Sequence, residues 1–168
     1  MLRLGNSFIM KYIKLKFSFI TSIKLSILFI SFFLLSVTSA LAADISIAPS
    51  NTAVSPNTQF TVSINISAVS NLFGAAFDLI FDPAILQFVS AQKGTFLEQD
   101  GVSTNLLTAV SPPGDLIIGY SRLASNGVAT GISGSGVLMT LTFNALSAGA
   151  SNLTFQNNSL CDASNPSG

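Results

Sequence analysis

Residues 73–88 read FGAAFDLIFDPAILQF, and this stretch decides the fold class. Its large apolar side chains recur at every second position, which is the period of a β-strand and not of a helix. One face of the strand then carries Phe73, Ala75, Phe77, Leu79 and Phe81. Asp82 and Pro83 follow, and because proline fixes φ and lacks an N–H, the strand must end there in a turn. The stretch therefore predicts a strand with a buried aromatic face.

The opposite face of this strand carries its two acids. Gly74, Ala76, Asp78, Ile80 and Asp82 alternate with the aromatic positions. Asp82 is most simply a turn former, since it precedes the proline. Asp78 lies in the middle of the strand, between a small residue and an aliphatic one. Two interpretations of Asp78 stay open: a solvated residue that protects an edge strand, or a member of a binding face.

The period of two continues through the rest of the chain. Runs such as QFTVSINIS and VLMTLTFNA alternate apolar and polar residues, and clusters of Gly, Pro, Ser and Asn separate them. The expected strands cover residues 44–48, 59–67, 73–82, 85–92, 103–110, 115–122, 136–146 and 151–160. The Gly/Ser-rich segment 124–136 is expected to be a long loop within the domain. Eight short strands at even spacing favour an all-β, antiparallel β-sandwich or barrel.

The N-terminal 42 residues are typical of an export signal. A basic segment precedes an apolar core of 11 residues, ILFISFFLLSV, and Ala40-Leu41-Ala42 provides the small residues of a cleavage site. That core falls short of the roughly 20 apolar residues that a membrane span needs. The interpretation is a signal peptide over 1–42 and one domain over 43–168, secreted and without a membrane span in the mature chain. An uncleaved signal anchor is the alternative.

Charge and composition exclude several functions. The mature chain keeps two cations, Lys93 and Arg122, against seven acids, hence a net charge of −5. A nucleic-acid partner is not expected, because that binding depends on Lys and Arg neutralising phosphates. The chain has no histidine and a single cysteine, Cys161, so neither a metal site nor an internal disulfide is expected, and no cofactor. Cys161 is interpreted as a small apolar filler, with intermolecular pairing as the alternative.

Three segments carry a family resemblance. They read SPNTQFTVSINISAVSNLFGAAFDLIFDPAILQFVSAQKGTFL, DLIIGYSRL and GISGSGVLMTLTFNALSAGASNLTF, and in this order they resemble a cohesin domain. The resemblance implies a jelly-roll sandwich of about eight to nine strands, related to carbohydrate-binding modules. It also implies a module with no catalytic residues, in which one sheet face binds a dockerin, a small calcium-binding helical module.

The resemblance suggests where a partner would bind. Scaffold cohesins present Asn and then Asp on the outer face of the strand before the Asp-Pro turn, and here the second matches Asp78 while the first falls on Ala76. We therefore expect a partner-binding face with Ala76, Asp78 and Ile80, and with Tyr120 and Arg122 as neighbours. Family members usually continue past a segment such as CDASNPSG into one more strand, and without that strand one edge is open. Two interpretations stay open: the sequence is a fragment of a longer protein that lacks the final strand, or the domain completes its sheet in another way.

Three function classes remain. The leading one is a secreted, non-catalytic cohesin-like module that recognises a dockerin-type protein in an extracellular polysaccharide-degrading (cellulosome-type) or cell-surface assembly. The second is direct binding of a polysaccharide, which relies on exposed aromatic rings, but the chain has no tryptophan and two tyrosines, Tyr12 and Tyr120. The third is a glycosidase, whose acid pair would be Glu98 and Asp100 in an exposed loop. We expect no enzyme activity.

Overall fold

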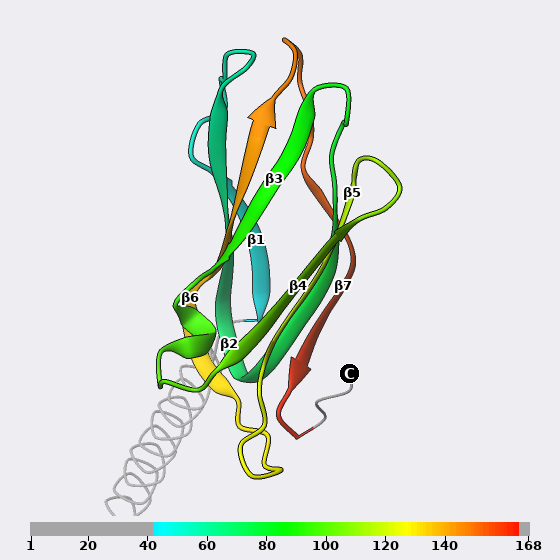
Figure 1. The fold of residues 1–168 in the computed structure, drawn as a ribbon. Helices are drawn as coiled ribbons and strands as arrows, with labels where there is room; N and C mark the ends of the chain where they lie inside the picture. The colour runs from blue at the N-terminus through cyan, green and yellow to red at the C-terminus, as the bar shows by residue number, and fades with distance from the viewer. Residues whose placement is uncertain (1–41, 165–168) are drawn as a thin grey trace, which may run out of the picture. The chain divides into compact units, whose positions relative to one another are not determined.

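The computed structural model of this chain describes residues 42–164, which Figure 1 shows as strands joined by loops. The strands are β1 (Asp44–Pro49), β2 (Gln59–Ile80), β3 (Leu86–Lys93), β4 (Thr104–Val110), β5 (Asp115–Arg122), β6 (Ile132–Ala145) and β7 (Thr154–Asp162), and η1 (Phe96–Glu98) is a single turn of 3-10 helix. All the strand pairs are antiparallel. The predicted all-β, antiparallel class is therefore confirmed.

The N-terminal part of the predicted export signal, residues 1–41, lies outside the described residues. Within residues 42–164, no helix has both the length and the apolar character that crossing a membrane requires.

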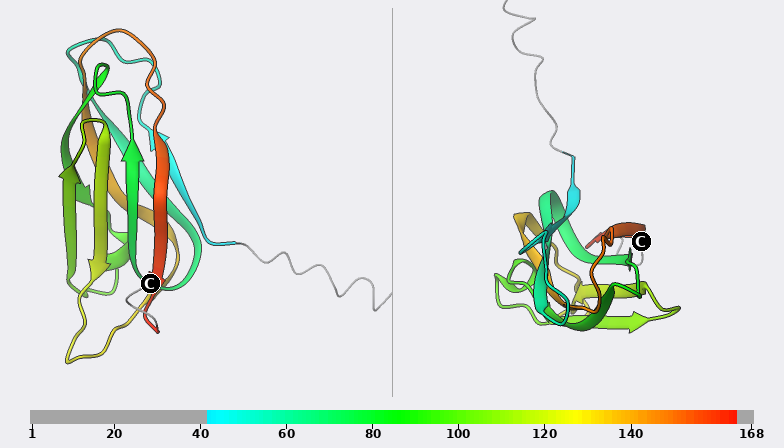
Figure 2. Two further views of the ribbon diagram at one scale, coloured as in Figure 1. Left: turned by 90° about the vertical axis from the view of Figure 1, so that its right-hand side faces the viewer. Right: turned by 90° about the horizontal axis from the view of Figure 1, so that it is seen from above.

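Strand β2 belongs to both layers of the sandwich. Its first half pairs with β1 and β6, and β3 pairs with β6 on the far side. Its second half pairs with β5 and β7, and β4 pairs with β5. Figure 1 shows β2 running along one layer, bending, and returning along the other, and the right panel of Figure 2 shows the two layers from above. The sequence predicts separate strands at 59–67 and 73–82, but the structure joins them in one bent strand.

Two serines of the Gly/Ser-rich segment 124–136 form hydrogen bonds with the bend in β2. Ala68 and Asn71 have left-handed φ values of 52° and 56°, and the pairing with β6 shifts register on both sides of Val69. The backbone N–H of Ala68 donates to Ser135 Oγ at 3.0 Å, and that of Asn71 donates to Ser133 Oγ at 2.9 Å. These serines satisfy donors that the bend removes from the strand ladder. The end of the predicted loop 124–136 is therefore part of β6.

The core lies between the two layers. Val62 and Ile64 from the first half of β2 and Phe77 and Leu79 from the second half are at most 2% exposed. The ring of Phe77 meets Phe155 of β7 edge to face at 5.1 Å between centroids. Burying these side chains provides the main favourable free energy of folding.

One residue of the predicted aromatic face lies outside this core. Phe73 is half-buried and is not part of the core cluster. The pairing of β2 with β7 shifts register between Leu72 and Gly74, and a shift of one residue breaks the alternation of faces.

Candidate functional site

Asp78 lies on a central strand. The second half of β2 runs between β5 and β7, where Asp78 is opposite Ile117 of β5 and Gln156 of β7. The left panel of Figure 2 shows β4, β5, β2 and β7 side by side across this layer. The interpretation that Asp78 protects an edge strand is therefore wrong, because both edges of its strand are paired.

The residues around Asp78 form one outer surface, which we call the Asp78 face. On β2, Ala76 and Ile80 lie two residues to either side of Asp78 and share its face. Gly119 of β5 is opposite Ala76, and Leu107 of β4 is opposite Gly119. The set is Ala76, Asp78 and Ile80 of β2, Leu107 and Ala109 of β4, Asp115, Ile117 and Gly119 of β5, and Thr154, Gln156, Asn157 and Ser159 of β7. The structure thus brings three of the predicted site residues, Ala76, Asp78 and Ile80, onto one face.

A bulge in β7 orients the carboxylate of Asp78. The amide Nδ2 of Asn157 donates to Asp78 Oδ2 at 2.6 Å. Asn157 has a left-handed φ of 49°, and the register of β2 against β7 shifts between Ala76 and Asp78. Asparagine tolerates this backbone conformation better than most residues. Asn157 could not be predicted as a site residue, because the QNNS segment gives no indication of which residue faces β2.

Beside Asp78 the face is apolar and slightly hollowed. Ala76 and Gly119 form the floor of a shallow depression that Ala109, Leu107 and Ile117 also line. The side chains of Leu107 and Ile117 are 65% and 42% exposed. Large aliphatic side chains that gather in one exposed place are typical of an interaction surface. A carboxylate held by a hydrogen bond thus lies next to an apolar area.

Tyr120 and Arg122 do not lie on this face. Each is 1% exposed, since β5 turns both of them inward together with Leu116 and Ile118. The hydroxyl of Tyr120 lies 3.4 Å from the hydroxyl of Thr104, and burial raises the pKa of Tyr120. Both residues were expected as neighbours of Asp78, but the alternation of β5 places them on the opposite side of the sheet.

Arg122 instead holds two loops together at one end of the sandwich. Its guanidinium donates to both carboxylate oxygens of Asp100, at 3.0 and 2.6 Å. It also donates to the carbonyl oxygen of Leu97 at 2.5 Å and to that of Thr130 at 2.7 Å. This fork of donors is the geometry for which arginine is suited. The hydrogen bonds from Arg122 hold the pKa of Asp100 below its usual value.

The carboxylate of Glu98, like that of Asp100, is held by hydrogen bonds and an ion pair. Thr104 Oγ1 donates to its carboxylate, and Lys93 Nζ lies 3.1 Å from Glu98 Oε1. The hydrogen bonds from Thr104 and then from Lys93 lower the pKa of Glu98. A glycosidase needs one acid whose pKa is raised so that it can donate a proton. The pKa values of Glu98 and Asp100 are both lowered instead. The two residues therefore do not match the acid pair of a glycosidase.

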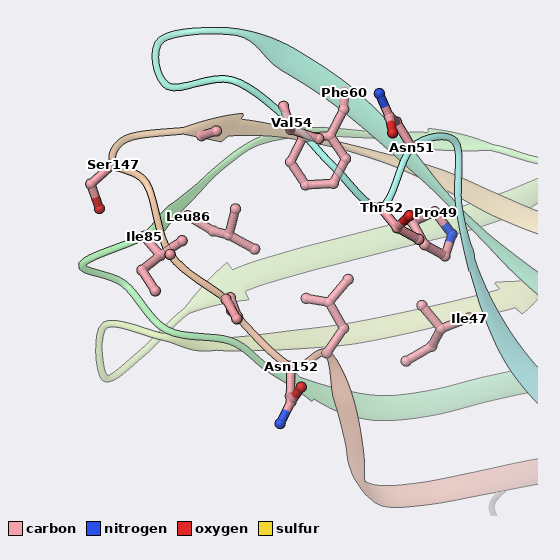
Figure 3. Close-up of a pocket in the computed structure, with 15 residues that line it drawn as sticks. Ile47, Pro49, Asn51, Thr52, Val54, Phe60, Ile85, Leu86, Ser147 and Asn152 are labelled. Atoms are coloured by element: carbon pink, nitrogen blue, oxygen red, sulfur yellow. The ribbon is translucent and has the colours of Figure 1, made fainter.

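A cavity of about 410 Å³ opens at the other end of the sandwich. Figure 3 shows Ile47, Phe60 and Ile85 on its walls, and Asn51 and Asn152 as its labelled amides. None of its lining residues is charged. Among residues 42–164 there is also no group of three or more His, Cys, Asp or Glu side chains that could hold a metal ion. The cavity is thus an opening in the apolar core without groups for acid-base or metal chemistry.

The fold and the Asp78 face together define a β-sandwich with a surface suited to recognition. A family model described as "Cohesin domain" matches residues 45–166, so the chain belongs to the cohesin domain family. This is a family of non-catalytic binding modules. No curated protein sequence matches the chain.

Solved structures agree with this assignment. A type II cohesin domain from the cellulosome of Acetivibrio cellulolyticus has a TM-score of 0.61 and 20% identity, over 74% of this chain and 86% of that chain. The sixth cohesin of scaffoldin B from the same organism, in complex with a Cel5 dockerin mutant, has a TM-score of 0.59 and 22% identity, over 73% and 88%. A non-cellulosomal cohesin from the archaeon Archaeoglobus fulgidus has a TM-score of 0.54 and 16% identity, over 73% and 80%. At these identities the likeness shows the fold.

Proposed function

We propose that this chain is a secreted, non-catalytic cohesin module that binds a dockerin-type protein through the Asp78 face. The observation that carries the proposal is a carboxylate on a central strand, oriented by Asn157 and bordered by exposed Leu107 and Ile117. One of the similar solved cohesins is in complex with a dockerin, which supports the same class of partner here.

The physical basis is the pairing of one polar anchor with apolar contact area. Interfaces gain specificity from a charged group that finds its partner and gain free energy from the apolar surface around it. Asp78 supplies the anchor, and Leu107 and Ile117 supply exposed aliphatic area. Asp78 of β2 and Ile117 of β5 come from strands that are paired on both sides, and Leu107 comes from the edge strand β4, which pairs with β5. The surface is therefore largely preorganised, so little conformational entropy is lost on binding.

The proposal includes location. The export signal predicted at residues 1–42 would deliver the domain outside the cell, where a cohesin contributes to a polysaccharide-degrading or cell-surface assembly. The A. cellulolyticus cohesin of similar fold comes from a cellulosome, whereas the A. fulgidus one is non-cellulosomal. We propose the extracellular setting and leave the type of assembly as a choice between these two.

Titration calorimetry against a panel of calcium-loaded dockerins tests the proposal. The wild-type domain should bind at least one member, and Asp78→Ala should weaken that complex by roughly thirtyfold or more, as expected when one partner of a buried charged hydrogen bond is removed. Asp44→Ala is the matched control, because Asp44 is exposed on β1 in the other layer. A wild-type domain that binds no dockerin, or an Asp78→Ala variant that binds as tightly as wild type, would contradict the proposal.

Direct polysaccharide binding has less support. The large apolar side chains that are exposed within residues 42–164 are all aliphatic, and Tyr120 is buried. Sugar rings stack on exposed aromatic rings, and no such platform is present in that part of the chain. A pull-down with insoluble cellulose, run alongside the dockerin panel, distinguishes the two functions.

A further inference from the structure

The core of the sandwich stays open at one end, in a cavity enclosed by the loops 50–58, 81–85 and 146–153, which we call the end cavity. Its walls carry four apolar side chains that are half-buried and pack against the core, namely Ile47, Phe60, Ile85 and Leu153. Figure 3 shows Ile47, Phe60 and Ile85 around this space. A ligand that enters displaces the water in contact with these side chains, and the loss of that contact favours binding.

The opposite end of the core is closed by the 3-10 turn η1. Its Phe96 and Leu97 are 3% and 0% exposed, and the carbonyl oxygen of Leu97 accepts a hydrogen bond from Arg122. At the end cavity, by contrast, the side chains of residues 42–164 leave about 410 Å³ unfilled. This volume lies within the roughly 300 to 1,000 Å³ of typical small-molecule sites.

Hydrogen bonds hold the three loops around the end cavity in place. The backbone N–H of Leu146 donates to the carbonyl oxygen of Ile85 at 2.7 Å, and that of Asp82 donates to Ser151 Oγ at 2.9 Å, so two of the loops are joined to each other. The third loop is joined to the sheet, because the N–H of Ser50 donates to a carbonyl oxygen of β2 at 2.8 Å. The cavity is therefore formed before a ligand enters, and little conformational entropy is lost on binding.

The lining of the end cavity favours neutral ligands. None of the lining residues is charged, and its polar side chains are hydroxyls and amides. Those of Thr52 and Asn152 form no hydrogen bond within residues 42–164, so they have donors and acceptors left for a ligand. Moving a charged group from water into such a cavity is costly, because no opposite charge is there to receive it.

We propose that the end cavity binds a small neutral molecule, an apolar ring that carries one hydroxyl or carbonyl group. The ring contacts the four half-buried side chains, among which Phe60 offers an aromatic contact. The polar group of the ligand stays at the rim, among the hydroxyls and amides of the loops. The end cavity shares no residue with the Asp78 face, so this site does not depend on the proposed dockerin function.

Three probes of different chemistry test the proposed ligand class. Benzyl alcohol is a neutral probe of this class, benzoate is a charged molecule of similar shape, and glucose is polar on all sides. In methyl NMR spectra of the wild-type protein, benzyl alcohol should shift the signals of Ile47, Ile85 and Leu153 until they saturate. Benzoate should bind about tenfold more weakly or less, and glucose should cause no shift. The absence of a saturable shift with benzyl alcohol, or equal binding of benzoate or glucose, overturns the proposal.

Filling the cavity tests where the probe binds. Ala150 is exposed and lines the end cavity, so the ring of Ala150→Phe occupies part of the space, and benzyl alcohol should bind about tenfold more weakly or less. Ala124→Phe is the matched control, because Ala124 is exposed in the loop between β5 and β6 and does not line the cavity. Wild-type affinity in Ala150→Phe overturns the assignment of the site. If thermal melts show that Ala150→Phe does not fold, Val54→Phe fills the same cavity from the loop 50–58 and replaces it.

Discussion

Adjacent residues on β2 should respond in opposite ways to truncation. Phe77 is 2% exposed and meets Phe155 edge to face, so Phe77→Ala leaves a cavity and removes an aromatic contact. Such truncations cost about 3 to 5 kcal/mol of unfolding free energy, against a total of about 5 to 15 kcal/mol for a domain. For a domain of this size, we expect the melting temperature to fall by roughly 10 to 20 °C.

Asp78→Ala removes a side chain from the outer face of the same strand. Its described hydrogen bond is the exposed one from Asn157, and the loss of such a bond costs about 1 kcal/mol. The melting temperature should therefore change by only a few degrees, while dockerin binding weakens by roughly thirtyfold or more. Thermal melts and calorimetric titrations give the melting temperature and the dockerin affinity of each variant. A large loss of stability in Asp78→Ala, with little in Phe77→Ala, would show that the strand register and the assignment of its faces are wrong.

Three further predictions concern other parts of the chain. Because hydrogen bonds from Arg122 lower the folded-state pKa of Asp100, this carboxylate should contribute stability above its usual pKa and lose that contribution as the pH falls through the lowered value; acid titrations of unfolding should show a shallower acid limb for Asp100→Asn, and an unchanged limb would refute the assignment. Asn157→Gly keeps the left-handed backbone but removes the amide that holds Asp78, so stability should change little while dockerin binding weakens severalfold; equal affinity would exclude a positioning role for Asn157. N-terminal sequencing of the exported protein should begin at or near Ala43, and recovery of an intact N-terminus would instead indicate the signal-anchor alternative.

The fold followed from the sequence wherever alternation and turn residues agreed. The stretch around Asp82 and Pro83 predicts a strand that ends in a turn, and β2 ends at Ile80 just before it. The joining of 59–67 and 73–82 into one strand was not predictable in this way. It depends on Ser133 and Ser135 satisfying the backbone at the bend, and these residues are more than 60 positions away in the sequence. Local propensity contains no information about such distant partners.

The site was predictable in part, for a related reason. Ala76, Asp78 and Ile80 share a face because they alternate along one strand, which the sequence states directly. Leu107 and Asp115 join them only through the register of neighbouring strands, which the sequence does not specify. The DLIIGYSRL segment does contain a clue that was misread. Tyr120 and Arg122 follow Leu116 and Ile118 at every second position of β5, so burial of the two apolar residues predicts that all four side chains point inward. The inward position of Arg122 was not expected, because arginine is rarely buried.

The sequence suggested that Arg122 lies on the face that contacts a partner, but its side chain points inward. A slip of one residue in β5 would exchange its two faces, turning Ile117 and Gly119 inward and Arg122 outward. Arg122 resists such a slip, because its hydrogen bonds to Leu97, Asp100 and Thr130 fix the end of β5 to two loops. The buried side of β5 therefore determines which residues its outer side presents to a partner. Under the proposed function, Arg122 would act as a positioning residue, through the register of the strand that carries Gly119.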